Sequence, residues 1–306
     1  MSGNNLDRVA VVTGASRGAG KGVALGLGQQ GLTVYVTGRS TDQSLGSSKG
    51  EALPGPIHET AAEITRLGGR GIAVACDHDN DDQVAALFAR IAAESGRVDI
   101  LVNNATFIHD NLIDPGGFWE KPLDLVRIID VGLRSAYVAS WHAARLMVPR
   151  GQGLITFVSS FGSSCYMHGP AYGAQKSGLD KFAADMGVDF EGTGCAAVSL
   201  WLGPQITERT AIAVRERPDQ YSEFMKVAET PQFNVRVIEA LARDPNLAKK
   251  NGQTDSDPCL AVSAAKRSAI RSNASSQPMR RNCVDPRSPV RSSGCVRRSG
   301  WWMRSA

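Results

Sequence analysis

The residues with the clearest capacity for chemistry are Tyr172 and Lys176, which stand four positions apart in the segment Tyr-Gly-Ala-Gln-Lys. On a helix this spacing places a phenol and an ammonium on one face. A phenol titrates at about pH 10, and a neighbouring cation is expected to lower its pKa, so that it can exchange a proton with a carbonyl or an alcohol. The spacing alone is common in helices, but here eleven residues separate Tyr172 from a Ser159-Ser160 pair at the end of an expected strand. The combination favours carbonyl or alcohol chemistry, for which a nicotinamide would supply the hydride.

A glycine-rich turn, Thr-Gly-Ala-Ser-Arg-Gly-Ala-Gly from Thr13 to Gly20, follows the first expected strand and opens a helix. Such a turn places backbone N–H groups and the positive end of a helix dipole beside a diphosphate, and glycine allows the close approach. A nucleoside-triphosphate P-loop is excluded, because that motif needs glycine and serine or threonine where this chain has Ala15 and Gly22. The turn therefore indicates a dinucleotide cofactor.

The end of the second expected strand predicts which dinucleotide binds. Folds that prefer NAD carry Asp or Glu there, which binds the ribose 2′-hydroxyl, whereas this chain has Gly38-Arg39. A carboxylate would repel a 2′-phosphate, but the guanidinium of Arg39 can bind one in a bidentate manner, and Arg17 in the glycine turn can approach the same group. We therefore expect NADP(H), with NAD(H) disfavoured.

These residues stand at the ends of elements that alternate between short apolar strands and longer helices. Strands buried on both faces and a repeating βα order are typical of a doubly wound parallel sheet, with ligands at the carboxyl ends of the strands. The predicted fold class is therefore α/β, a Rossmann-like sheet in a single domain. The expected strands are Val9–Thr13, Thr33–Thr37, Gly71–Cys76, Val98–Asn103, Leu154–Ser159 and Cys195–Trp201; the expected helices are Ala19–Gln30, Ile57–Leu67, Asp81–Ser95, Leu123–Met147, Ala171–Phe190 and Pro231–Arg243.

Two stretches depart from this alternation. Residues 39–56 are rich in Ser, Gly and Pro and predict a long surface loop beside the adenosine end of the cofactor. Beyond Gly252 the chain loses all periodicity. We therefore expect a catalytic domain over residues 1–252 and a basic Ser/Arg-rich tail over residues 253–306 that is either disordered or the product of a frameshift.

The charge of the chain is divided between these two parts. The net charge is +4, and residues 253–306 carry nine Arg and one Lys against three Asp, or +7, so that −3 remains for residues 1–252. A mildly acidic body argues against nucleic acid as a partner.

The six cysteines lack the spacing of zinc sites, so the sequence predicts no bound metal. The sequence shows neither a leader segment nor an apolar run of membrane length, and we therefore expect a cytoplasmic location.

Taken together, these motifs resemble the short-chain dehydrogenase/reductase family over about residues 6–252. The resemblance rests on the glycine turn, Asp77 after the third strand, Asn-Asn-Ala at the end of the fourth, the serine pair, the Tyr/Lys pair, and a strand-end glycine before Thr207.

The resemblance implies an oxidoreductase that acts on CH–OH or C=O groups of a small-molecule carbonyl or alcohol. Tyr172 would be the general acid/base, Lys176 would also hold the nicotinamide ribose, and Ser160, with Ser159 as the alternative, would orient the carbonyl. A homo-oligomer is implied if the carboxyl terminus permits the subunit contacts. Cofactor-binding residues would be Gly14, Ser16, Arg17, Gly18, Ala19, Gly20, Arg39, Asp77 (adenine), Asn104 (adenosine side), Tyr172, Lys176 and Thr207 (nicotinamide end).

Three departures from the family pattern suggest an alternative function. Gly132 stands where many members have an Asn that completes a proton relay through water, and Leu202 replaces the usual Pro after the sixth strand. After Gln253 the chain is polar where an apolar last strand is expected, which predicts a missing or altered edge strand and a frameshifted or replaced terminus. The alternative to an enzyme is therefore a catalytically silent nucleotide-binding or scaffold protein of the same fold.

Overall fold

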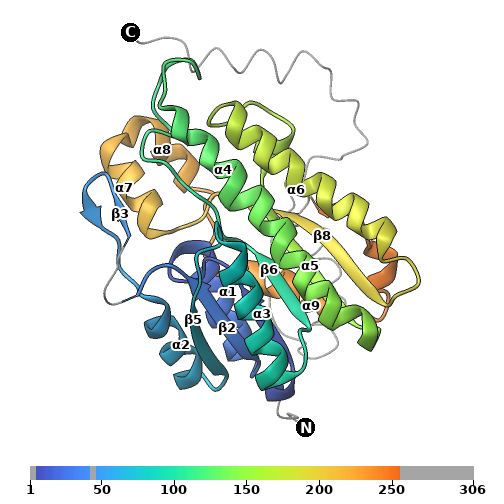
Figure 1. Cartoon of the computed structure of the whole chain (residues 1–306). Coiled ribbons are helices and arrows are strands. Elements are labelled where there is room, and N and C mark those ends of the chain that lie inside the picture. The colour runs from blue at the N-terminus through green and yellow to red at the C-terminus, as the bar shows by residue number, and fades with distance from the viewer. Residues whose placement is uncertain (1–4, 42–45, 256–306) are drawn as a thin grey trace, which may run out of the picture. The chain divides into compact units, whose positions relative to one another are not determined.

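The computed structural model describes residues 5–41 and 46–255. Its main sheet has seven parallel strands in the order β5-β2-β1-β6-β7-β8-β9 (Figure 1). Every pairing in this sheet is parallel, as predicted from the buried apolar strands. The strands are β1 (Val9–Val12), β2 (Thr33–Gly38), β5 (Arg70–Ala75), β6 (Ile100–Asn103), β7 (Gly153–Ser159), β8 (Cys195–Trp201) and β9 (Thr254–Asp255).

The strand order reverses direction beside β1. The chain runs outward from β1 through β2 to β5 and then returns to β6 on the other side of β1. At this point the Thr13 N–H donates to the Val102 carbonyl at 3.0 Å, so that the glycine turn begins next to the end of β6. In open α/β sheets, ligands bind outside the strand ends where the order reverses. The predicted motifs therefore meet where a ligand is expected.

The core lies in two layers, because alternate residues of each strand point to opposite faces of the sheet. In β1, Ala10 and Val12 pack with α1, α2 and α9, whereas Val9 and Val11 pack with α3, α5 and α6. Figure 1 shows α3, α5 and α6 along one face of the sheet. The helices are α1 (Gly18–Gln29), α2 (Ile57–Arg66), α3 (Asp81–Ser95), α4 (Arg127–Ile129), α5 (Ser135–Met147), α6 (Pro170–Asp189), α7 (Glu208–Glu216), α8 (Pro218–Met225) and α9 (Phe233–Ala242).

Several predicted elements need correction. The expected helix 123–147 is interrupted: a π-helical turn covers Asp130–Arg134, and within it Val131 and Gly132 leave helical geometry, with φ of 146° at Gly132. The expected loop 39–56 contains a small antiparallel pair, β3 (Ser47–Ser48) and β4 (Glu51–Ala52). Helices α7 and α8 had no counterpart in the sequence prediction, because their short, charged segments lack a clear apolar stripe.

The last edge strand, expected to be missing or altered, is present as the two-residue β9. Thr254 pairs with Ser199 and Asp255 with Leu200. The sheet thus continues past the predicted domain boundary at residue 252. The rest of the predicted tail, residues 256–306, lies outside the described residues, so the hypothesis of a frameshifted terminus stays a hypothesis.

Candidate active site

The serine and tyrosine that were predicted to be catalytic come together at the carboxyl end of β7. Ser160 follows the strand directly, and its Oγ lies 2.9 Å from the Tyr172 hydroxyl near the start of α6. The Gly162 N–H donates to the same Oγ at 3.2 Å and fixes the serine rotamer. The Ser159 hydroxyl instead donates to the Lys176 carbonyl at 3.2 Å and is buried. The geometry therefore places Ser160, not Ser159, against the phenol.

Lys176 lies beneath the tyrosine, with its ammonium 5.4 Å from the centre of the Tyr172 ring. The ammonium donates to the Val158 carbonyl at 3.0 Å, and the side chain is almost completely buried. Burial disfavours the charged form and lowers the pKa of Lys176 to about 8. The negative charge of Asp180 acts in the opposite direction and raises this pKa. Asp180 itself accepts hydrogen bonds from Ser199 at 2.5 Å and Trp201 at 2.9 Å.

The expected lowering of the Tyr172 pKa is wrong for this structure. Burial raises the pKa of Tyr172, and the hydrogen bond with Ser160 opposes this only in part. The reason is geometric, because the Lys176 ammonium reaches the Val158 carbonyl and lies over the ring instead of beside the hydroxyl. Tyr172 is consequently protonated at neutral pH, which is the form that can donate a proton.

The side chains around the tyrosine ring come from the loop between β7 and α6. The imidazole of His168 packs edge-to-face on Tyr172 with ring centres 5.0 Å apart, and burial lowers the pKa of His168 to about 4, so the ring is neutral. Of the aromatic residues in neighbouring loops, Phe161 packs on Trp201 with ring centres 5.4 Å apart, whereas Tyr166 is 80% exposed. The loop thus offers a neutral, partly aromatic wall.

The glycine-rich turn is held in place by residues after β6. The Asn104 amide donates to the carbonyls of Thr13 at 2.9 Å and Gly14 at 3.0 Å, and the Thr13 hydroxyl accepts from the Ala105 N–H at 2.9 Å. A side chain on Gly20 would meet the Asn104 amide at 2.3 Å, which explains the glycine. Asn104 therefore ties the two strand ends together and shapes the turn from behind.

The first turn of α1 binds a carboxylate of the protein itself. Arg17 precedes the helix and makes no side-chain capping bond, and the Gly18 N–H donates to the Glu208 carboxylate at 3.0 Å. Ser16 is buried, and Ala19 and Gly20 continue the turn into the helix. Backbone N–H groups and the helix dipole thus face the space in front of the turn.

Basic side chains gather where β2 and β5 end. Arg17 donates to the Ser40 hydroxyl at 2.7 Å and to the Pro54 carbonyl at 3.2 Å. Arg39 is more than half exposed and lies 3.9 Å from Asp77, a long contact that leaves its guanidinium available. Sequence reasoning missed Ser40, although its position directly after Arg39 could have suggested it. Two guanidiniums and a hydroxyl therefore surround the expected position of the adenosine ribose.

Thr207 is the N-cap residue of α7 and lies beside the glycine turn. It forms a capping box with Thr210, and its methyl lies 3.6 Å from the Cβ position of Gly18. The predicted residue at the nicotinamide end is therefore next to the cofactor turn, held by its own helix cap.

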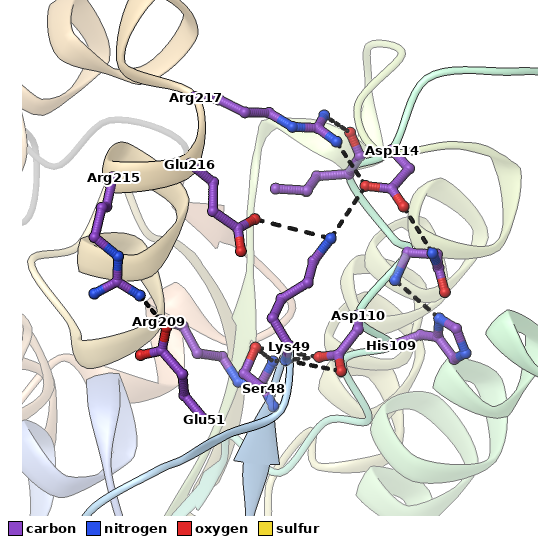
Figure 2. A network of polar contacts seen from close by, with 12 residues as sticks. Ser48, Lys49, Glu51, His109, Asp110, Asp114, Arg209, Arg215, Glu216 and Arg217 are labelled. Atoms are coloured by element: carbon purple, nitrogen blue, oxygen red, sulfur yellow. Dashed lines mark hydrogen bonds and ion pairs between the residues drawn. The ribbon is translucent and has the colours of Figure 1, made fainter.

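A network of charged groups joins the β3–β4 pair to the loop after β6 and to α7 with the Arg217 that follows it (Figure 2). Asp114 accepts from Arg217 at 2.6 Å and lies 3.4 Å from the Lys49 ammonium, which is 3.8 Å from Glu216. Ser48 and Arg209 join the same network at 3.2 Å. Its three segments are far apart in the sequence, so no local pattern could have predicted it.

Comparison with known proteins decides the family. The profile of the short chain dehydrogenases matches residues 8–220. The chain belongs to the short-chain dehydrogenase/reductase family.

Individual relatives agree with this family. The chain is 38% identical over 257 residues to the human dehydrogenase/reductase SDR family member 1, covering 80% of this chain and 78% of that protein, and 39% identical to the mouse protein over the same shares. A solved structure from Agrobacterium tumefaciens, described as a candidate gluconate dehydrogenase, superposes with a TM-score of 0.67 at 27% identity, over 81% and 92% of the two chains. Members of this family are oxidoreductases that use a nicotinamide cofactor.

Over residues 5–41 and 46–255, no cluster of three or more His, Cys, Asp or Glu side chains is arranged to hold a metal ion. Within the same described part of the chain, no helix is both long and apolar enough to cross a membrane.

Proposed function

We propose that this protein is an NADP(H)-dependent oxidoreductase that interconverts a carbonyl and an alcohol, with Tyr172 as the general acid/base. The observation that carries the proposal is the 2.9 Å contact between the Ser160 hydroxyl and the Tyr172 hydroxyl, with Lys176 buried beneath the ring. The cofactor supplies the hydride when it is bound. The residues present fit it, because the first turn of α1 binds an anionic group, the Glu208 carboxylate, whose place a diphosphate would take, and the guanidiniums of Arg17 and Arg39 match a 2′-phosphate.

The chain's own residues would handle the substrate oxygen. Ser160 shares a hydrogen bond with Tyr172, so a carbonyl oxygen placed between the two hydroxyls receives a hydrogen bond from each. As negative charge develops on that oxygen during reduction, Tyr172 gives up its proton to it, and the Ser160 hydroxyl can donate a hydrogen bond to the resulting phenolate. The raised pKa of Tyr172 supports the role of an acid, because the hydroxyl is fully protonated at neutral pH.

The cofactor preference is tested by the kinetics of Arg39→Ala. We expect kcat/KM for NADPH to fall roughly 30-fold, which corresponds to about 2 kcal/mol for a lost charge-assisted hydrogen bond, while kcat/KM for NADH changes little. Arg66→Ala removes an arginine that is 72% exposed on α2 and is the matched control. Equal losses with both cofactors would contradict the assignment of Arg39 to the 2′-phosphate.

Turnover is tested with NADPH and a panel of aldehydes, ketones and quinones, followed by the decrease in absorbance of NADPH. We expect at least one substrate to be reduced and Tyr172→Phe to lower kcat by on the order of 10³-fold while NADPH still binds. Cofactor binding without turnover on a broad panel would favour the alternative, a catalytically silent nucleotide-binding or scaffold protein, to which the unusual Gly132 points.

The proposed homo-oligomer and the cytoplasmic location remain predictions. Light scattering on the purified chain distinguishes a monomer from a homo-oligomer directly, and a monomer that turns over substrate would show that catalysis does not need subunit contacts.

A further inference from the structure

Glu208 is an acidic side chain that makes the contact expected of a cofactor phosphate. Its carboxylate accepts a hydrogen bond from the Gly18 N–H at 3.0 Å, although the two residues are 190 positions apart in the sequence. Gly18 is the first residue of α1, where backbone N–H groups and the helix dipole attract anions. The carboxylate therefore binds at the start of α1 as a phosphate oxygen binds in a dinucleotide site.

The carboxylate of Glu208 is not needed to cap its own helix. A glutamate in the first turn of a helix ordinarily interacts with the N-terminus of that helix. In α7 this end is already held by a capping box, in which the Thr210 N–H donates to the Thr207 hydroxyl at 3.2 Å and the Thr207 N–H donates to the Thr210 hydroxyl at 2.8 Å. The Glu208 side chain crosses instead to α1, so its contact with the glycine turn calls for a separate explanation.

The charge of Glu208 also acts on the guanidiniums near the glycine turn. Burial and the positive charge of Arg209 lower the pKa of Arg17, whereas the negative charge of Glu208 raises it. Glu208 therefore offsets part of the positive charge at the turn, as an anionic ligand would. When the carboxylate leaves, the repulsion between the two guanidiniums favours the binding of another anion in its place.

Helix α7 is held at both ends, which keeps Glu208 close to the turn. Next to Glu208, Arg209 donates to the Ser48 hydroxyl of the β3–β4 pair at 3.2 Å. Directly after the helix, Arg217 donates to Asp114 in the loop after β6 at 2.6 Å (Figure 2). A group held near its binding position in this way competes at a high effective concentration, so a single carboxylate can oppose a ligand from solution.

The Glu208 side chain has space into which it can move. It borders a groove of about 390 Å³ beside α1, which Lys21 and Pro231 also line. A carboxylate that leaves Gly18 therefore finds both room and a cation in this groove. Its release needs only a change of side-chain rotamer, which is fast, and α7 can keep its anchors at both ends.

We propose that Glu208 is a built-in competitor of the cofactor, whose carboxylate occupies the Gly18 N–H in the free protein and must leave before the cofactor diphosphate binds there. This inference rests on the proposed function, because it needs a dinucleotide at the glycine turn. A protein of which only a fraction is competent to bind has its affinity reduced by that fraction. Because NADPH and NADH carry the same diphosphate, Glu208 weakens both by the same factor, whereas Arg39 acts only on the 2′-phosphate.

Calorimetric titration of the full chain with NADPH and with NADH tests the inference without any need for turnover. Glu208→Gln keeps the size of the side chain and removes its charge, and we expect the Kd of each cofactor to fall about tenfold. Glu208→Asp keeps the charge but is one methylene shorter, so it should no longer reach Gly18, and the Kd should fall about fivefold. Glu223→Gln is the charge-matched control: Glu223 is 79% exposed on α8, and its loss should change the Kd by less than about twofold.

Equal Kd values for the wild type and Glu208→Gln overturn the inference. A Glu208→Asp variant that binds both cofactors as the wild type does also overturns it, because charge alone would then explain any gain in Glu208→Gln. Adenosine 2′-monophosphate has no diphosphate and should bind the wild type and Glu208→Gln equally, and a comparable gain for this ligand would again indicate a general effect of charge and overturn the inference.

The inference and the proposed function can fail separately. A tenfold gain in cofactor affinity without reduction of any carbonyl supports the competitor role of Glu208 and refutes the proposed catalysis. An enzyme that reduces substrates but whose cofactor affinity does not respond to position 208 refutes only the competitor role. If neither cofactor binds to the wild type or to Glu208→Gln, both are refuted.

Discussion

Replacing Lys176 with methionine should make the protein more stable at neutral pH while abolishing catalysis. The side chain is 6% exposed, and burial lowers its pKa from 10.5 to about 8. At about 1.4 kcal/mol for each pKa unit, holding the ammonium charged in the folded state costs about 3 kcal/mol at pH 7. Methionine has a similar length and no charge. The lost hydrogen bond to the Val158 carbonyl offsets about 1 kcal/mol, which leaves a gain of about 2 kcal/mol.

The sign of the pH dependence follows from proton binding. Because the folded state binds the Lys176 proton more weakly, the unfolded state holds more protons between about pH 8 and pH 10.5. The free energy of unfolding of the wild type therefore receives a favourable contribution that grows as the pH rises through this window. The methionine variant lacks this growth, so its advantage should shrink above about pH 8 and vanish near pH 10.

Urea unfolding at about pH 7 and about pH 9.5 measures both effects. Lys181→Met is the matched control on the same helix. Lys181 is 70% exposed and, within the described residues, pairs only with Asp185 on the surface, so its change should stay within about 0.5 kcal/mol. The reasoning is refuted if Lys176→Met is less stable than the wild type at pH 7, or if the difference between the two does not depend on pH.

Three further predictions concern the same site and the charged network around Asp114. Ser160→Ala should lower kcat by on the order of 10²-fold in the NADPH assay, whereas Ser159→Ala should change kcat less than fivefold, and similar losses would contradict the assignment of the serine. Gly132→Ala should lower the free energy of urea unfolding by about 3 kcal/mol, because the new side chain would combine a strained φ with overlap of a neighbouring side chain. Gly96→Ala is the control and should cost only about 1 kcal/mol, because Gly96 has a φ of 65° but nothing within 4 Å of the added Cβ. Equal costs for the two variants would refute the overlap. Burial raises the pKa of Asp114, but contacts from Asn111, Lys49 and Arg217 lower it overall. The contribution of Asp114 to stability is therefore present at neutral pH and is lost as the pH falls through the lowered pKa. In Asp114→Asn the Tm should fall less steeply as the pH is lowered into the acid range, and an unchanged pH dependence would count against the network.

Most of the sheet could be predicted from the sequence, because its strands are buried and buried strands consist of short runs of apolar residues. The expected strand Leu154–Ser159 and the observed β7 differ by a single residue at one end. The pattern is weaker for β5, which lies at the sheet edge with half-exposed residues, although its register with β2 is complete. Where hydrophobic burial determines an element, the spacing of apolar residues is enough to predict it.

The sequence also indicated which residues are candidates for the chemistry, and the tertiary structure decided how they are arranged. The glycine turn, the serine pair and the Tyr/Lys pair are visible in the sequence because each is a local pattern at a strand end. The choice of Ser160, the raised pKa of Tyr172 and the contact of Glu208 with the glycine turn are not local, since each depends on where side chains from distant segments come to lie. Their physical cause is burial and contact between those segments, which exist only once the chain has folded.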